Sequence, residues 1–250
     1  VKKSEVWHHE EKFHGTKVYN KISNIKKIIN EDDASYLLIT SNESICWLLN
    51  LRGKDLAFTP IFMSRLIIEK NGNCYLFANI KNQLKFAKNI NITIIQPKYL
   101  DDFLSKNTSF KKIIVDERTL PANINKLLTY IKADIKNKND PIEILKSQKN
   151  INELKGIKAA HLRDGVALSK SIFWIKQKVN KGSLTELQAV RKIDANRRNS
   201  KYFHSLSFPT IAGSGPNGAI VHYHVTKKSD RTSFSCRTSI RIFYLYITTI

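Results

Sequence analysis

The stretch SRLIIEKNGNCYLFA, residues 64–78, decides the fold class. Its two ends, residues 64–69 and 74–78, are rich in β-branched and aromatic side chains, which favour strands. Asn71-Gly72 lies between them and is a strong signal for a two-residue hairpin turn. The stretch therefore predicts an antiparallel β-hairpin.

The residues around this hairpin alternate between helical and strand patterns. Residues 17–30 place four isoleucines on one helical face. Short β-rich or apolar runs predict further strands at residues 36–40, 45–51, 92–95 and 112–115, and helices are expected at 82–88 and 99–105. Together these elements predict an α/β domain with a mixed sheet.

The sequence changes character at KADIKNKNDP, residues 132–141. This segment is polar, rich in lysine and closed by a proline, so it predicts a linker. Beyond it, residues 144–177 carry a helical apolar stripe that Gly156 or Gly165 is expected to interrupt.

A second helix and two strands are expected after this stripe. Ser183-Leu-Thr-Glu186 has the form of a capping box that opens a helix ending near Asn199. Residues 207–212 and 219–224 are expected to be strands joined by the glycine-rich loop 213–218.

The charge of the chain is strongly positive, at +21 over 250 residues. A basic excess of this size is typical of nucleic-acid binders. However, 32 of the 42 basic residues are Lys, and Lys, Ile and Asn together make up 86 residues, a bias expected from AT-rich coding DNA. The lysines are scattered rather than clustered. Composition therefore does not favour nucleic acid as a partner.

The cysteines and the termini indicate a cytoplasmic protein. Cys46, Cys74 and Cys236 lie far apart, which excludes a disulfide framework and a thiolate zinc site. The first residues contain no apolar run of the kind found in a secretory signal. The longest apolar stretch, residues 242–250, is too short to span a bilayer, so no membrane association is expected.

Two motifs could carry chemistry, and neither is decisive. On a strand, His222 and His224 would face the same side, as a pair of metal ligands does, but Asp230 is the only acid that follows. A solvated or structural pair is the alternative. The loop at residues 213–218 lacks the Lys-Ser/Thr of a phosphate-binding loop.

The amino-acid sequences of several longer stretches are more specific than these two motifs. Residues 45–55, ICWLLNLRGKD, resemble the WLLN(I/L)RG segment of proline-specific aminopeptidases, the aminopeptidase P group of the creatinase and M24 metallopeptidase family. Further similar stretches follow in the expected order at residues 140–146, 149–155, 163–165, 184–186, 207–213 and 217–223.

The resemblance implies an architecture of two creatinase-type α/β domains and a pita-bread metallopeptidase domain. Residues 1–139 resemble the second creatinase-type domain, with its mixed sheet, and residues 140–231 resemble part of the α+β pita-bread domain. Residues 232–250 contain no Asp, Glu, Lys, Asn or Gly. We interpret them as an aberrant tail from a shifted reading frame, with an ordinary terminal strand pair as the alternative.

The resemblance also implies a chemistry. In the family, two Asp, one His and two Glu bind two divalent metals, usually manganese, which activate a water for attack on the peptide bond before proline. All five ligands lie downstream of the histidine that matches His222, and the chain has no acid between Thr232 and Ile250. We therefore expect no metal ligands and no cofactor in this chain. His222 would be the substrate-binding histidine, and His224 has no implied role.

The resemblance together with the missing metal ligands predicts a fragment of an Xaa-Pro aminopeptidase that is inactive by itself, or an enzyme whose metal-binding half is a separate polypeptide. Once completed, it would act on peptides with proline at the second position. The alternative is a non-enzymatic interaction or dimerisation module built on the creatinase-type domain, in which a second copy of the chain is the partner and the two form a homodimer.

Overall fold

The computed structural model describes residues 3–82, 84–86, 90–182, 184–233 and 241–242. The chain forms two compact units, one up to Leu154 and one from Lys155 onward. The domain boundary placed between residues 139 and 140 stays a prediction. None of the helices in the described part of the chain combines the length and apolar character needed to cross a membrane.

The first unit is built on a six-stranded mixed sheet in the order β6-β5-β4-β2-β7-β8. Strand β4 pairs antiparallel with β2 and β5, and the other neighbours are parallel. The predicted mixed sheet is therefore confirmed. The strands are β2 (Tyr36–Ile39), β4 (Ser64–Glu69), β5 (Cys74–Ala78), β6 (Ile92–Ile95), β7 (Lys112–Val115) and β8 (Asp134–Asn137).

The hairpin between β4 and β5 is present, but its turn is one residue longer than predicted. The backbone N–H of Glu69 donates to the carbonyl of Asn73 (2.9 Å), which leaves three residues in the loop. Gly72 has a φ of 98°, a conformation that glycine adopts readily. A three-residue loop that ends on such a glycine is the next most common hairpin connection.

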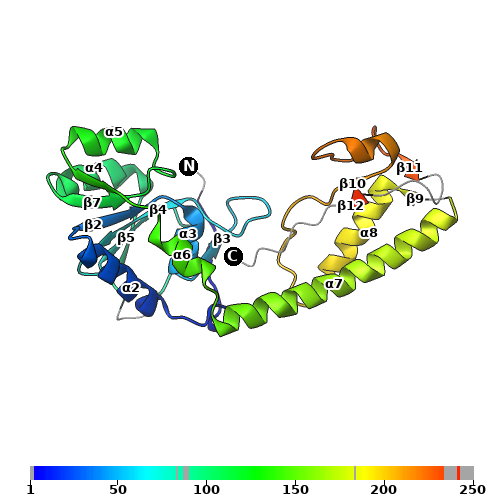
Figure 1. Cartoon of the computed structure of the whole chain (residues 1–250), viewed down its shortest axis with the longest axis horizontal. Helices are drawn as coiled ribbons and strands as arrows, with labels where there is room; N and C mark the ends of the chain where they lie inside the picture. Colours follow the sequence, from blue (N-terminus) through cyan, green and yellow to red (C-terminus); the bar gives the residue numbers. More distant parts are fainter. Residues whose placement is uncertain (1–2, 83, 87–89, 183, 234–240, 243–250) are drawn as a thin grey trace. The chain divides into compact units, whose positions relative to one another are not determined.

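Helices cover both faces of this sheet, as Figure 1 shows. Side chains alternate along each strand, so Leu37 and Ile39 of β2 pack into one core and Tyr36 and Leu38 into the other. The first core includes residues of α2 (Val18–Glu31), α3 (Asn42–Leu48) and α6 (Pro141–Ser147), and the second includes residues of α4 (Leu100–Thr108) and α5 (Ala122–Tyr130). The unit is thus a three-layer α/β/α sandwich.

Smaller elements complete the first unit. Strand β1 (Val6–His8) pairs antiparallel with β3 (Leu51–Gly53), helix α1 (Glu11–His14) follows β1, and the 3₁₀ turn η1 (Pro97–Tyr99) leads into α4.

Three of the predicted elements in this unit are wrong. Residues 45–48 lie in helix α3, residues 49–50 form a turn, and only Leu51 is in a strand, as the first residue of β3. Ser41 caps α3 by accepting a hydrogen bond from the backbone N–H of Ser44 (3.3 Å). Because this apolar run is buried almost throughout, its periodicity does not separate helix from strand. The helix expected at 82–88 is absent at residues 82 and 84–86, and its other residues lie outside the described part.

The expected linker is also folded. It contains β8 and the first residue of α6, and two of its lysines form ion pairs: Lys136 and Lys138 contact Asp32 at 2.8 and 2.6 Å. The polar composition therefore marks a sheet edge rather than a linker.

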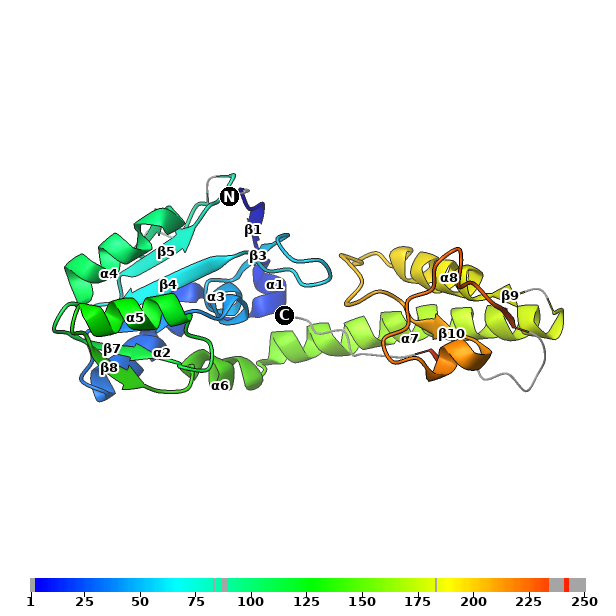
Figure 2. The same ribbon diagram turned by 90° about the horizontal axis from the view of Figure 1, so that it is seen from above.

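The second unit contains most of α7 (Ile151–Asn180), a continuous helix that begins in the first unit (Figure 2). Gly156 and Gly165 do not interrupt it. The helical pattern is interrupted earlier, at residues 148–150, which separate α6 from α7. A small apolar core joins α7 to the rest of the unit through Ile175, Leu184, Ala189, Ile193 and Ala212. The other elements are β9 (Leu184–Thr185), α8 (Glu186–Arg198), β10 (Ala212–Gly213), η2 (Gly215–Ala219), β11 (Thr232–Ser233) and β12 (Arg241–Ile242).

Two further expectations are corrected in this unit. The capping box of α8 lies two residues later than predicted, with Thr185 as N-cap and Gln188 as its partner, because Leu184 and Thr185 pair with Thr232 and Ser233 as β9 and β11. Residues 219–224 are not a strand: Ala219 ends η2, Ile220 lies in a bend, residues 221–222 form a turn, and residues 223–224 have no regular secondary structure. In the 207–212 segment only Ala212 is in a strand.

A strand needs a hydrogen-bonded neighbour. Among the described residues, nothing pairs with residues 219–224. Of the tail interpreted as aberrant, only residues 232–233 and 241–242 are described; the remainder lies outside the described residues.

Candidate functional site

The predicted site residue, His222, lies on an exposed turn of the second unit. Its φ is +53°, a left-handed conformation that is uncommon for a non-glycine residue. His224 is also exposed. Because residues 219–224 do not form a strand, the period-two argument that placed both imidazoles on one face does not apply.

The residue between the two histidines is buried and tightly bonded. The Tyr223 side chain is 7% exposed, and its hydroxyl donates to the carboxylate of Glu186 at 2.8 Å. Burial and this carboxylate raise the pKa of Tyr223. The turn that carries His222 is therefore anchored to the rest of the unit through the buried side chain of Tyr223, the next residue in the sequence.

Glu186 is the centre of this polar cluster, and sequence analysis assigned it only a capping role. It is 4% exposed at the first position of α8. Its oxygens accept hydrogen bonds from the backbone N–H of Ser214 (2.6 Å) and from the side-chain amide of Asn217 (3.1 Å to each oxygen). No local sequence signal marks a carboxylate whose partners lie 28 to 45 residues further along the chain.

The donor set of this region does not fit a two-metal centre. The oxygens of Glu186 are already occupied by protein donors, and Asp230 accepts from the backbone N–H of Leu187 (3.0 Å). Within the described ranges, no group of three or more His, Cys, Asp or Glu residues is placed to hold a metal ion.

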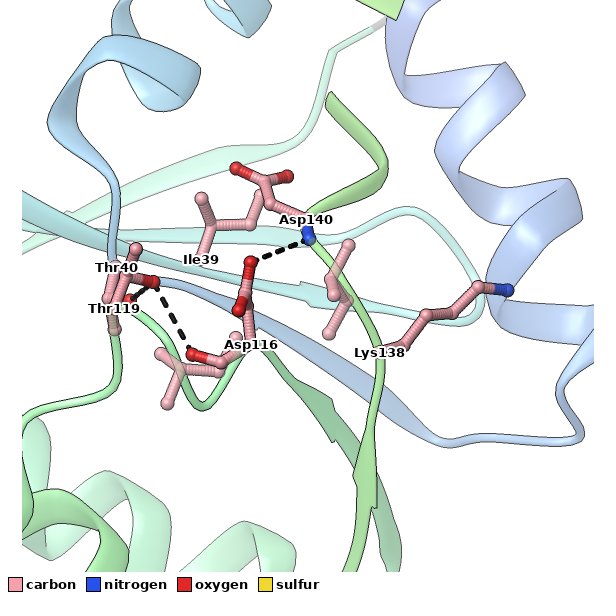
Figure 3. Close-up of a pocket in the computed structure, with 8 residues that line it drawn as sticks. Ile39, Thr40, Asp116, Thr119, Lys138 and Asp140 are labelled. Atoms are coloured by element: carbon pink, nitrogen blue, oxygen red, sulfur yellow. Dashed lines mark hydrogen bonds between the residues drawn. The ribbon is translucent and has the colours of Figure 1, made fainter. Parts of the chain in front are cut away.

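A second candidate site lies in the first unit, at the carboxyl ends of the parallel strands β2, β7 and β8 (Figure 3). Such edges are common ligand sites in α/β folds. Asp116 accepts hydrogen bonds from the backbone N–H of Asp140 (2.8 Å) and from the Arg118 guanidinium, which lowers the pKa of Asp116 to about 2. Thr40 and Thr119 share a hydroxyl contact of 2.6 Å.

This cavity is too small for a peptide. Its volume is about 10 Å³, room for a single water molecule. Asp140, whose pKa is raised by burial, caps α6 by accepting from the backbone N–H of Ile142 (2.9 Å). The cluster therefore joins three loops and the start of α6, and we assign it a structural role.

Comparison with known proteins supports the interpretation of both units. Residues 1–153 match the model of the creatinase/prolidase N-terminal domain, and residues 155–241 match metallopeptidase family M24. The chain is 31% identical over 251 residues to Xaa-Pro aminopeptidase 1 of Dictyostelium discoideum, covering 97% of this chain and 38% of that protein. It is 32% identical over 227 residues to Xaa-Pro aminopeptidase ApepP of Drosophila melanogaster, covering 87% of this chain and 36% of that protein.

The fold comparison agrees. The crystal structure of X-prolyl aminopeptidase from Caenorhabditis elegans, described as a cytosolic enzyme with a di-nuclear active site, superposes with a TM-score of 0.82 at 22% identity, over 92% of this chain and 39% of that one. The prolidase from Pyrococcus horikoshii gives a TM-score of 0.59 at 18% identity, over 89% of this chain and 59% of that one.

The chain thus spans 38% or less of the curated relatives described above. Within that span, the first match contains the six-stranded mixed sheet and the second begins within helix α7. The chain therefore belongs to the family of the creatinase/prolidase N-terminal domain, which its first unit matches. Its second unit matches metallopeptidase family M24, and relatives that it matches along both units are named Xaa-Pro aminopeptidases.

Proposed function

We propose that this chain provides the creatinase-type domain and the first part of the catalytic domain of an Xaa-Pro aminopeptidase, an enzyme that removes the N-terminal residue preceding proline. The observation that carries the proposal is the collinear match: both units align, in order and over nearly the whole chain, with proteins of that name. The same relatives do not favour the alternative of a non-enzymatic interaction module.

In this proposal, the residues that bind the metal ions and the 250 residues of this chain belong to different parts of the enzyme. The acids available in the second unit are used as structural acceptors, and the sequence contains no Asp or Glu after Asp230. The proposal therefore places the metal-binding residues on a polypeptide segment outside these 250 residues. By itself the chain would bind substrate weakly and leave the peptide bond intact.

The surface of the second unit supports such a completing segment. Residues 155–233 carry 15 Lys and Arg against 4 Asp and Glu. On α7, Leu162, Val166 and Phe173 share one helical face and are 72%, 48% and 67% exposed. An apolar stripe on a strongly basic unit fits a partner segment with apolar side chains and an acidic surface, and an acidic metal-binding half is such a segment.

We propose that His222 contacts the substrate in the completed enzyme. Its side chain is exposed, while its neighbour Tyr223 is fixed in the Glu186 cluster. An imidazole held in this way can donate or accept one hydrogen bond at a defined position. A cytoplasmic location fits this function, since a structural neighbour of the same kind is described as cytosolic.

The test is complementation. The 250-residue chain would be coexpressed with the remaining part of an M24 domain from a relative, and hydrolysis of a peptide with proline in the second position would be followed with Mn²⁺ present. We expect release of the N-terminal residue from the complex and none from either polypeptide alone. The same peptide with alanine in place of proline is the specificity control.

Two outcomes would overturn the proposal. One is hydrolysis by the 250-residue chain alone. The other is a stable complex of the two polypeptides that binds manganese and fails to cleave the proline peptide.

A further inference from the structure

The carboxylate of Glu186 connects three segments that are separate in the sequence. Ser214 and Asn217 belong to the glycine-rich loop and η2, Tyr223 to the histidine turn, and the backbone N–H of Arg231 (3.4 Å) to the segment before β11. Without this acceptor, the buried donors of these segments would lose their common partner.

The cluster is closed by a second set of bonds. The Asn217 amide nitrogen also lies 2.9 Å from the Tyr223 hydroxyl oxygen and 3.1 Å from the carbonyl oxygen of Ser229, so its two hydrogens are shared among these acceptors and the Glu186 carboxylate. Asn217 and Tyr223 are 8% and 7% exposed, so these bonds are largely shielded from water. In a shielded network each bond depends on the others, and removing one partner leaves an unpaired polar group.

The conformation of His222 makes this anchoring necessary. A left-handed φ costs free energy for a residue with a Cβ atom, and such a conformation persists only where its surroundings hold it in place. On the C-terminal side, the Tyr223–Glu186 bond supplies that support. On the N-terminal side, η2 is held through Asn217, which bonds the same carboxylate.

We propose that Glu186 is a positioning residue: it fixes the turn 219–224 from both sides and so sets the location of the His222 imidazole. The role of His222 toward substrate rests on the function proposed above, whereas the control of the turn by Glu186 does not. Glu186 acts through other side chains and does not contact the substrate.

The first experiment measures the turn directly. Amide hydrogen exchange of residues 219–224 would be followed in the 250-residue chain for the wild type, Glu186→Gln and Tyr223→Phe. Glu186→Gln keeps the size of the side chain but replaces one acceptor with a donor, and Tyr223→Phe removes a single hydroxyl. An amide of this segment that is protected by a hydrogen bond is that of Ile220, which donates to the carbonyl of Asn217 (3.2 Å). We expect its exchange to rise about tenfold or more in both variants, with α7 unchanged.

Asp194→Asn is the matched control. Asp194 is another carboxylate of α8, and it accepts a hydrogen bond from the Thr210 hydroxyl (2.6 Å), not from the turn. This variant should leave exchange at residues 219–224 as in the wild type. Unchanged exchange in Tyr223→Phe and Glu186→Gln, or an equal rise in Asp194→Asn, would overturn the proposal. If Glu186→Gln fails to fold, Tyr223→Phe decides.

The second experiment asks whether Glu186 acts through His222. In the completed enzyme, kcat/KM on a proline peptide would be measured for Glu186→Gln, His222→Ala and the double variant. If Glu186 positions His222, the Glu186→Gln loss should largely disappear once His222 is alanine. Additive losses would contradict the positioning role.

An unaltered kcat/KM in His222→Ala would contradict the proposed substrate contact instead. The exchange result would then still decide the structural role of Glu186.

Discussion

Lys21 shows how strongly a single side chain of this protein is constrained by its surroundings. It is 2% exposed in the core of the first unit. Its ammonium donates to the carbonyl of Trp47 and to the side chain of Asn50, both at 2.7 Å, and lies 3.7 Å from the centre of a Trp47 ring. These contacts favour the charged form, but burial outweighs them and lowers the pKa of Lys21 to about 7.

This pKa predicts a pH dependence of stability. Between about pH 7 and 10.5 the unfolded chain keeps the proton on Lys21 while the folded chain releases it. Since the unfolded state binds more protons at Lys21 there, this side chain contributes a free energy of unfolding that rises with pH across the window. Above about pH 9 the raised pKa values of the buried Cys46 and Cys74 thiols act in the opposite sense, so the contribution of Lys21 is measured as the difference between the wild type and Lys21→Met in urea unfolding. That difference should grow in favour of the wild type from about pH 7 to 10.5, and a difference that is the same at both ends would refute the assignment.

Neither Lys21 nor Glu186 could be recognised from the sequence, and the reason is the same. Each is one charged residue among many, and its burial is decided by residues distant along the chain, such as Asn50 for Lys21 and Ser214 for Glu186. Resemblance singled out His222, but its turn conformation came only from the structure.

At the scale of elements, helix α7 depends on its first turn. The Asn150 side chain accepts hydrogen bonds from the backbone N–H groups of Asn152 (2.9 Å) and Glu153 (3.0 Å), and Glu153 accepts in return from the backbone N–H of Asn150 (2.8 Å). Glu153 also accepts from the indole N–H of Trp47 (3.0 Å). The cap therefore also ties the helix to α3.

Removal of this cap should be costly. Asn150→Ala removes the acceptor for two backbone donors and the bond from its amide to the carbonyl of His14 (2.8 Å). We expect a loss of about 1–2 kcal/mol in the free energy of unfolding, measured by urea titration. Lys149→Ala, at the exposed neighbouring position, is the control and should change it by less than about 0.5 kcal/mol. Equal effects would argue against the cap.

Substitution of the two glycines inside α7 should raise the free energy of unfolding, whereas removal of the Asn150 cap should lower it. A Cβ atom added at Gly156 or Gly165 meets nothing within 4 Å. Because alanine has the higher helix propensity and restricts the unfolded chain, Gly156→Ala and Gly165→Ala should each stabilise the chain by about 0.5–1 kcal/mol. Thermal unfolding would detect this as a higher midpoint. A lower midpoint would mean that α7 bends or packs at these positions.

Elements with a clear period or a turn signal were predictable, and elements defined by distant partners were not. Helix α2 and the β4–β5 hairpin follow directly from local pattern. Helix α3 was mistaken for a strand because it is buried on most sides, and β8 was mistaken for a linker because it is a charged edge. Residues 219–224 read as a strand by composition, but in the described residues they have no neighbouring strand.

At the scale of the whole molecule, the two units differ in how much core they have. The first unit has an apolar core on each side of its sheet, whereas the described core of the second is a single cluster of five buried residues. We expect calorimetry to show two transitions, with the second unit unfolding at the lower temperature. Binding of the completing segment should raise only that transition. A single transition for the chain alone would contradict this account.

The family was predictable at this scale because short stretches match it in order across the chain. The charge was misleading at first: +21 is typical of a nucleic-acid binder. With the second unit assigned to part of an M24 domain, we interpret its share of the basic excess as the surface for the completing segment proposed above.

The most direct test of the account is the metal content and activity of the purified 250-residue chain. The chain would be saturated with Mn²⁺, desalted, analysed for bound metal, and assayed for release of the N-terminal residue from a peptide with proline in the second position. We predict substoichiometric metal and no release above the buffer blank. Two tightly bound metal ions per chain together with cleavage before proline would contradict the claim that the metal-binding residues lie outside this chain.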